Sequence, residues 1–345
     1  MTAQPLKTLE ALEREGLLVA NATLRAVADR YAISLTPALA GLIDKGDPAD
    51  PIARQFLPDT SELQTHAEEL ADPIGDQAHE PVKGIVHRYR DRVLLKLVHV
   101  CPVYCRFCFR REMVGPGGEP PLAGEALDAA LAYIGSHEEI WEVILTGGDP
   151  FIVPPHVARS ITQRLEAIRH LRVLRWHTRV PIADPTRVNE AFVAAITSRS
   201  KTVYVAIHVN HARELSAEAR AALHRLSAAG VPLLSQTVLL RGVNDRAEAL
   251  AELMRTLVEL RVKPYYLHQA DLAPGTSHFR VPLKEAQTIY AELRNRVSGI
   301  CLPSFVIDIP AGHGKVPASS VHVRKAADGN FIISDDDGAL HTYRG

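Results

Sequence analysis

Apolar residues recur with two different spacings along most of the chain, and the alternation of these spacings predicts an α/β fold. Short runs rich in apolar and β-branched residues occupy 93–100, 143–147, 173–180, 203–209, 232–240 and 263–269. Between the runs, apolar residues return every three or four positions, as on one face of a helix; Leu127, Leu131 and Ile134 are an example. Six strand–helix units in succession predict a parallel sheet, which could be open or closed into a barrel.

The two ends of the chain depart from this alternation. Residues 1–80 combine short helical patterns with polar breaks such as 44–51, and we expect an accessory cap or a subunit contact without evident chemistry. Residues 305–310 have the pattern of one more strand, and 321–334 alternate around a central Asp-Gly-Asn, which predicts a surface hairpin. We therefore expect three parts: an N-terminal helical region (1–80), a strand–helix body (81–300) and a C-terminal loop with a β-hairpin tail (301–345).

Composition narrows the class of protein. The chain has 345 residues, of which 46% are hydrophobic, and a net charge of −1, so it carries no charge pattern for nucleic acid or for a membrane surface. No run reaches the roughly 18 apolar residues that a membrane-spanning helix needs, and the N-terminal stretch lacks the apolar core of a signal peptide. We expect a cytoplasmic protein without a nucleic-acid or membrane partner.

Three of the four cysteines stand close together, and their spacing indicates a metal centre. Cys101, Cys105 and Cys108 follow the pattern Cys-x3-Cys-x2-Cys, whereas Cys301 is far away in the sequence. Clustered thiolates can converge on a soft metal, and a [4Fe–4S] cluster normally takes four cysteine ligands. With three ligands, one iron would stay open to a substrate or cofactor. Two alternatives remain: a Cys3His zinc site that uses His99, and three buried hydrophobic cysteines.

The residues of this stretch resemble a known loop. Cys-Arg-Phe-Cys-Phe-Arg-Arg, at 105–111, is similar to the cluster loop of the radical S-adenosylmethionine (SAM) enzymes, and in particular to that of the lysine 2,3-aminomutase family. The resemblance extends over about residues 80–320. It implies a partial (βα)6 radical SAM barrel with an N-terminal helical extension and a short C-terminal β tail, and a site at the carboxyl ends of the strands. It also implies three cofactors: a [4Fe–4S] cluster on the three cysteines, SAM, and pyridoxal 5′-phosphate (PLP).

The same resemblance assigns residues to SAM. Gly147, Gly148 and Asp149 end the second strand run in Thr-Gly-Gly-Asp-Pro, which looks like the motif that holds the amino group of SAM. Two glycines at a strand end would let the backbone approach a ligand closely, although turns use the same residues. His208 and Gln236, in the fourth and fifth strand runs, fall where the family contacts SAM. Either polar side chain could instead satisfy hydrogen bonds in the core.

A lysine near the C-terminus and three residues before the first strand run resemble the PLP site. Lys315 follows a small-residue loop similar to the one that carries the family's PLP lysine, although His313 interrupts the glycine run. A lysine amine can form the Schiff base on which PLP chemistry depends, whereas most lysines are simply solvated. By resemblance, Arg88 and Arg92 hold the PLP phosphate, for which guanidinium groups are well suited, and Tyr89 packs on the ring.

Three charged residues resemble a substrate site for a basic amino acid. Arg110 matches the family's carboxylate-binding arginine, and Asp271 and Asp308 match the two carboxylates that bind a distal ammonium. The resemblance therefore implies an isomerase that moves the amino group of L-lysine from C2 to C3 and gives β-lysine. Arginine remains an alternative substrate because its guanidinium would also suit two aspartates, whereas a glutamate side chain would be repelled.

The resemblance also implies partners. The family needs a one-electron donor of the flavodoxin or ferredoxin type, and we expect a homo-oligomer. From a different class of function, a non-catalytic zinc-binding regulator would use the same cysteines. The chain shares features with the branch that forms β-lysine for translation elongation factor P and with the branch that acts on free lysine, so the pathway stays open.

Overall fold

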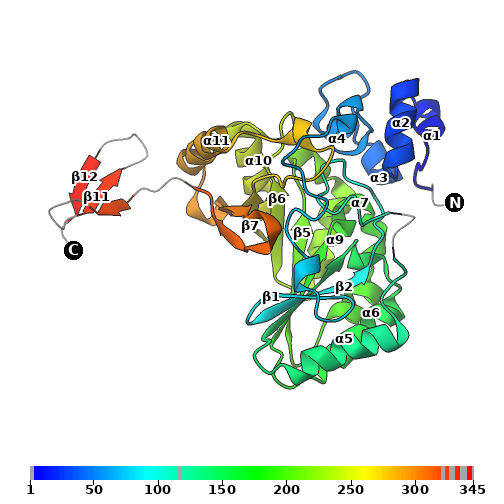
Figure 1. Ribbon diagram of the computed structural model, residues 1–345, viewed down its shortest axis with the longest axis vertical. Coiled ribbons are helices and arrows are strands. Elements are labelled where there is room, and N and C mark those ends of the chain that lie inside the picture. The colour runs from blue at the N-terminus through cyan, green and yellow to red at the C-terminus, as the bar shows by residue number, and fades with distance from the viewer. Residues whose placement is uncertain (1–3, 116–118, 320–322, 326–330, 335–339, 344–345) are drawn as a thin grey trace.

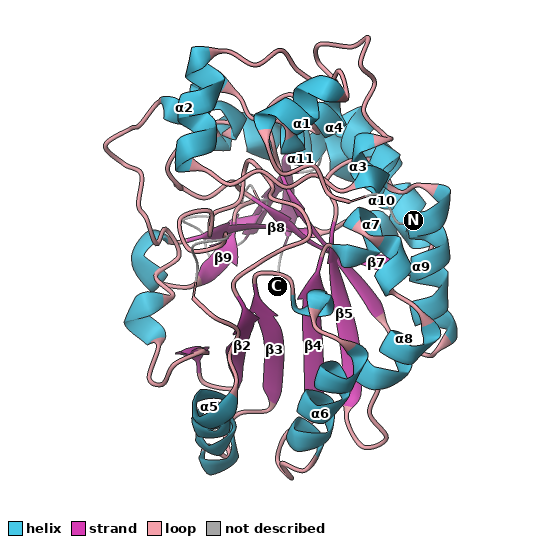
Figure 2. Cartoon of the chain, turned by 90° about the vertical axis from the view of Figure 1, so that its right-hand side faces the viewer, coloured by secondary structure: helices cyan, strands magenta, loops and turns pink. Residues whose placement is uncertain are grey.

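A curled, nine-stranded sheet forms the body of the protein (Figures 1 and 2). The computed structural model describes residues 4–115, 119–319, 323–325, 331–334 and 340–343. Its strands are β1 (Ile85–Tyr89), β2 (Arg92–Val98), β3 (Glu142–Gly147), β4 (Val173–Thr178), β5 (Thr202–His208), β6 (Leu233–Val238), β7 (Val262–His268), β8 (Ser304–Asp308) and β9 (Lys315–Pro317).

The order of the strands in the sheet is their order in the chain. Strands β2 to β8 are parallel, and β1 and β9 pair antiparallel at the two edges. The two edge strands do not pair with each other, so the barrel stays open. The six predicted strand runs correspond to β2 to β7, and the seventh, at 305–310, corresponds to β8. The predicted partial barrel is confirmed.

Helices cover the outer face of the sheet, because each carries one apolar stripe (Figure 2). In α10, for example, Leu250, Leu253 and Leu257 are buried against the strands. Strand β3 is buried along its whole length, as expected for a parallel strand covered on both faces. The helices that connect the strands are α5 (Gly124–Ser136), α6 (Pro155–Glu166), α7 (Val180–Ala183), α8 (Glu190–Ile196), α9 (Ala217–Ala228), α10 (Ala247–Glu259) and α11 (Leu283–Arg296). Within the described residues, no helix is both long and apolar enough to cross a membrane.

The N-terminal region consists of short helices and irregular chain at the end of the barrel where the parallel strands finish (Figure 1). The helices are α1 (Leu9–Arg14), α2 (Ala22–Arg30), α3 (Pro37–Ala40) and α4 (Pro51–Phe56). Several polar side chains of this region are hydrogen-bonded to the cysteine loop and to residues of the predicted site, so the region contributes contacts to that site. Glu62 contacts Arg106, and Asp76 contacts Arg88 and Arg110.

The C-terminal tail contains a separate, small antiparallel sheet that projects from the body in Figure 1. Its strands are β10 (Val323–Lys325), β11 (Phe331–Ser334) and β12 (Leu340–Tyr343). The predicted hairpin is confirmed in its strands, since Val323 pairs with Ile333 and Lys325 with Phe331. Its predicted turn, at 328–330, lies outside the described residues. The third strand, β12, was not predicted.

Candidate active site

The three clustered cysteines lie in the loop that follows β2, at the carboxyl ends of the parallel strands. Burial raises the pKa of all three thiols, that of Cys105 to about 11. A buried thiolate therefore needs a cation beside it, and an iron–sulfur cluster would supply that cation. Cys301 instead lies in the hydrophobic core, just before the amino end of β8, and therefore at the opposite end of the strands. In the part of the chain that the structure describes, no three His, Cys, Asp or Glu side chains are grouped to hold a single metal ion.

The N-terminal region holds the cysteine loop in place through backbone contacts. The amide of Tyr104 donates to the carbonyl oxygen of Ser34 (3.0 Å), and the Ser34 hydroxyl donates to the carbonyl oxygen of Pro102 (2.8 Å). The amide of Arg106 donates to the carbonyl oxygen of Gln55 (2.8 Å). These contacts order a loop that has no regular structure of its own.

A buried carboxylate fixes the segment after the second cysteine. Glu62 is fully buried and accepts from Nε of Arg106 (2.9 Å) and from Nη2 of Arg111. Arg111 also donates to the carbonyl oxygen of Gly275 (2.9 Å), which lies beyond β7. The sequence analysis missed Glu62, because a single glutamate in an irregular region gives no local signal.

The two glycines after β3 are required by the close approach of the cysteine loop. Gly147 has a φ of +113°, and a Cβ atom there would overlap the carbonyl oxygen of Val98. At Gly148 a Cβ atom would overlap the backbone of Val100. This close backbone packing is compatible with the expected role of the motif in holding SAM, which stays a prediction.

The acidic residue of the same motif is turned toward β4. Asp149 is buried and accepts from the Thr178 hydroxyl (2.7 Å) and from the amide of Arg179 (2.7 Å). Burial nevertheless raises the pKa of Asp149 above its ordinary value, since hydrogen bonds from the protein offset it only in part. The carboxylate therefore connects the ends of β3 and β4.

His208 and Gln236 are neighbours at the ends of β5 and β6, where they pair in register. Burial holds the pKa of His208 well below its usual range, so the imidazole is neutral near pH 7. Its Nε2 is buried and has no hydrogen-bond partner among the described residues. The ring lies edge-on to Phe107 of the cysteine loop, with ring centroids 5.7 Å apart. An unpaired nitrogen beside this loop is suited to a bound ligand.

Lys315 lies with its predicted partners at the edge of the sheet. Its amide donates to the Tyr89 hydroxyl (2.9 Å), and the Arg92 guanidinium stacks on the Tyr89 ring at 3.8 Å. The ammonium of Lys315 forms an ion pair with Asp308 and is 3.4 Å from Nδ1 of His268. The structure thus brings together three of the four residues predicted for PLP and adds His268, which the sequence analysis missed.

The fourth residue predicted for PLP, Arg88, is connected to the predicted substrate arginine through one carboxylate. Asp76 is 1% exposed and accepts from Arg88 (3.2 Å) and from two nitrogens of Arg110 (3.2 and 2.8 Å). Burial alone would raise the pKa of Asp76, but the two guanidinium groups outweigh it and lower that pKa. Asp76 uses Nε and Nη2 of Arg110 and leaves Nη1 for another partner.

The turn that carries Asp76 also touches the lysine loop. Gly75 packs so closely on the backbone at 311–312 that a Cβ atom would overlap it. The amide of Ala311 donates to the carbonyl oxygen of Pro73 (3.3 Å), and Nε2 of His79 lies 3.1 Å from the carbonyl oxygen of Gly312. The 73–79 segment therefore contacts both the loop that leads to Lys315 and the predicted substrate arginine.

The two predicted ammonium ligands differ in charge. Burial, and then the neighbouring carboxylate of Asp308, raise the pKa of Asp271 to about 7. Burial would also raise the pKa of Asp308, but a hydrogen bond from His268 and the ammonium of Lys315 lower it to about 2. The two carboxylates are thus close enough to repel each other, and one of them already holds a primary ammonium.

Replacing Asp271 with asparagine is expected to stabilise the cofactor-free protein at about pH 8 and to change its stability little at about pH 4. The pKa of Asp271 is about 7 in the native protein, against roughly 3.9 in an unfolded chain. Between these values the native state holds a proton that the unfolded state releases, so the wild type loses stability as the pH rises through this window. Urea unfolding of both proteins at both pH values measures the difference. An equal change at the two pH values would contradict the raised pKa.

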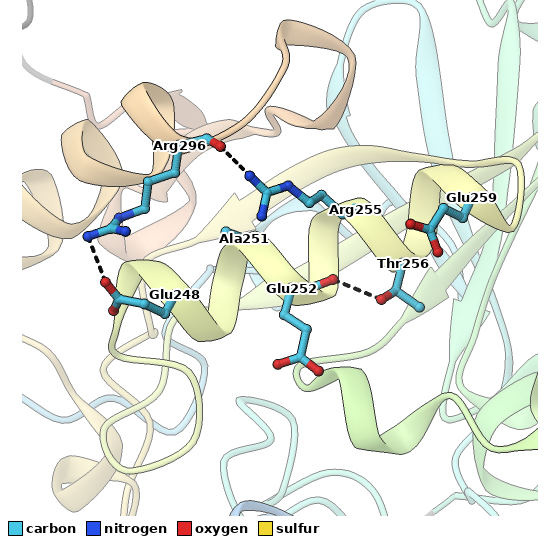
Figure 3. Close-up of a pocket in the computed structure, with 7 residues that line it drawn as sticks. All are labelled: Glu248, Ala251, Glu252, Arg255, Thr256, Glu259 and Arg296. Atoms are coloured by element: carbon cyan, nitrogen blue, oxygen red, sulfur yellow. Dashed lines mark hydrogen bonds and ion pairs between the residues drawn. The ribbon is translucent and has the colours of Figure 1, made fainter.

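A separate surface pocket lies on the outside of the barrel (Figure 3). It is lined by Glu248, Ala251, Glu252, Arg255, Thr256, Glu259 and Arg296. Arg296 pairs with Glu248 (2.6 Å), and Arg255 donates to the carbonyl oxygen of Arg296 (2.5 Å). None of the predicted site residues lines it, so it is not part of the candidate active site.

Comparison with known proteins agrees with this arrangement. Residues 95–254 match the Radical SAM superfamily. The chain is 37% identical to the L-lysine 2,3-aminomutase of Clostridium subterminale, over 96% of this chain and 77% of that relative. It is 37% identical to the enzyme of the same name from Escherichia coli K12, over 83% of each chain. With the one from Bacillus subtilis 168 the identity is 34%, over 96% of this chain and 68% of the relative. Identity of this degree over nearly the whole chain places the protein in the lysine 2,3-aminomutase family of radical SAM enzymes.

Proposed function

We propose that this protein is a lysine 2,3-aminomutase, an isomerase that moves the α-amino group of L-lysine to C3 and yields β-lysine. One observation carries the choice of substrate. Asp308 forms an ion pair with the amine of Lys315, and burial and the charges of Asp308, Lys315 and Arg110 all shift the pKa of the neighbouring Asp271. One cation for a carboxylate and two anions for a distant cation describe a basic amino acid. The names of the relatives support the same substrate.

The proposed cofactor sites rest on the family resemblance, and the geometry of the site supports them. We assign the [4Fe–4S] cluster to Cys101, Cys105 and Cys108, where buried thiols need a cation. SAM is assigned to Gly147, Gly148, Asp149, His208 and Gln236, and PLP to Arg88, Tyr89, Arg92 and Lys315. When bound, these groups supply a carbon radical that takes a hydrogen from the substrate and a conjugated ring that lets the amino group migrate.

The residues of the chain orient the substrate. Asp308 keeps a low pKa and stays ionised, and it now pairs with Lys315. With PLP held on the Lys315 nitrogen, this carboxylate would be available to accept the distal ammonium of lysine. The arriving cation lowers the pKa of Asp271, so that both carboxylates are charged when the substrate is bound. Asp76 holds the Arg110 guanidinium through Nε and Nη2, and we assign Nη1 to the carboxylate of the substrate.

Partners and location complete the proposal. We propose a one-electron donor of the flavodoxin or ferredoxin type, a homo-oligomer and a cytoplasmic location. We keep the division into an N-terminal region (1–80), a barrel (81–300) and a C-terminal part (301–345). Assays of the anaerobically reconstituted protein with lysine, arginine and glutamate test the function directly. Turnover of arginine alone would move the assignment to an arginine 2,3-aminomutase, and zinc in place of iron would point to the regulator.

Replacing Asp308 with alanine is expected to lower kcat/KM for lysine. The decrease should correspond to a loss of about 2–5 kcal/mol of transition-state stabilisation, as when one partner of a buried charge pair is removed. The loss leaves the substrate ammonium with Asp271 alone. The measurement compares lysine with norleucine, which has the same carbon chain but no side-chain ammonium, in wild type and variant. The preference for lysine should collapse in the variant. A variant that discriminates as well as the wild type would remove Asp308 from the ammonium site.

A further inference from the structure

Arg179 is a buried charged residue for which the proposed function has no role. It follows β4 directly and is 5% exposed. Its Nη1 lies 3.5 Å from Sγ of Cys105, which makes an N–H···S hydrogen bond to one of the proposed cluster ligands. In the structure, it is the only guanidinium group with a described hydrogen bond to one of these three sulfurs.

The guanidinium is fixed by contacts from three distant parts of the chain. Its Nη2 donates to Gln55 (2.9 Å) and forms an ion pair with the fully buried Glu214. The guanidinium carbon lies 4.8 Å from the ring centroid of Phe56 and 5.6 Å from that of Phe107. The side chain therefore cannot turn away from the sulfur without breaking several contacts at once.

The backbone of the same residue is fixed as well. Its amide donates to Asp149 (2.7 Å), the acidic residue of the Gly-Gly-Asp motif. A buried ion pair such as Arg179–Glu214 adds little net stability, because desolvation of both charges offsets their attraction. Such a group, positioned with this precision against a ligand sulfur, is better explained by an effect on the bound metal centre.

We propose that Arg179 sets the reduction potential of the iron–sulfur cluster. The inference rests on the proposed ligation by Cys105. A one-electron reduction adds negative charge to the cluster and its thiolates, and no proton is needed. The Nη1–H group of Arg179 points to the sulfur, whereas the counter-charge, Glu214, is bound to the other terminal nitrogen, Nη2. The positive charge is therefore closer to the sulfur than the negative charge. Hydrogen bonds to cluster sulfurs are among the factors that set these potentials, and a cationic donor favours the reduced state. Arg179 thus raises the potential and makes it easier for the donor to reduce the cluster.

The test compares a single variant with a double variant. Glu214→Gln keeps Arg179 and its bond to Cys105, whereas Arg179→Met with Glu214→Gln removes that bond. Neither variant leaves a buried anion without a partner. Iron and sulfide contents are measured first, and the midpoint potential of the cluster is then measured by anaerobic titration followed by electron paramagnetic resonance, without SAM.

The proposal requires the potential of the double variant to fall below those of the wild type and of Glu214→Gln, while that of Glu214→Gln stays level or rises. A purely structural role would shift both variants alike, and equal potentials in the two variants would overturn the proposal. Arg179→Lys, which keeps the charge but shortens the reach to Cys105, should also shift the potential negative. If the wild type takes up no iron, both the proposed function and the inference are wrong. If the cluster is loaded and its potential is unchanged in the double variant, only the inference is wrong.

Discussion

Lysine turnover should be lost completely when Lys315 is replaced with alanine. The amine of this residue is the group that we expect to form the covalent bond to PLP, and none of the other residues that we assign to the site offers a primary amine. Its surroundings suit that task, because the Tyr89 hydroxyl holds its amide and Asp308 holds its ammonium. Removal of the amine leaves the sites assigned to the cluster and to SAM intact, so the variant should still bind SAM.

The position of the bond can be mapped chemically. Borohydride reduction of the PLP-loaded wild type should leave a stable adduct on Lys315 and on no other lysine. Lys263 provides a matched control, since its ammonium donates to the carbonyl oxygens of Ile300 (2.8 Å) and Leu302 (3.1 Å), near the amino end of β8. Lys263→Ala should keep the adduct and the activity. An adduct mapped to another lysine would refute the assignment of Lys315.

The parallel strands could be predicted from the sequence because burial on both faces makes them read as continuous apolar runs. The run at 143–147, for example, corresponds to the wholly buried β3. The seventh parallel strand, β8, was recognised from its short apolar run, in which Phe305 and Val306 are buried. The open form of the barrel came from the family resemblance alone, since periodicity does not reveal whether the edge strands pair.

The contacts of the N-terminal region could not be predicted, because they join residues that are far apart in sequence. Glu62 and Arg106 are 44 positions apart, and Gln55 and Glu214 are 159 positions apart. The region has no strong hydrophobic period, so it read as an accessory cap. The position of Arg179 beside Cys105 could not be predicted either, since its hydrogen-bond partners come from three separate segments.

The charge states of the site also depend on tertiary contacts. The sequence places Asp271 and Asp308 as equivalent ligands, yet one has a pKa of about 7 and the other of about 2. Burial raises the pKa of both carboxyls, but His268 and Lys315 contact Asp308 and lower its pKa. Residue identity at a matched position predicts which chemistry a side chain can perform, whereas its tertiary neighbours determine its protonation state.

The cluster assignment predicts opposite outcomes for two cysteine substitutions. Wild-type protein isolated without oxygen should contain about four irons per chain, as a [4Fe–4S] cluster requires. Cys105→Ala should lose the cluster and all cleavage of SAM, because two remaining thiolates cannot hold a cubane at this loop. Cys301→Ala should keep both, since Cys301 lies in the core at the other end of the strands.

The two substitutions make a matched pair because each removes one sulfur from a partly or fully buried position. Circular dichroism should show the same secondary structure in both variants, so that a difference in iron reflects ligation rather than folding. Iron and sulfide analysis and the brown colour of the reconstituted protein then decide the result. Loss of the cluster in Cys301→Ala alone would show that a fourth cysteine takes part. The iron that the three-cysteine site leaves open would then be closed, and the chemistry assigned to it could not stand.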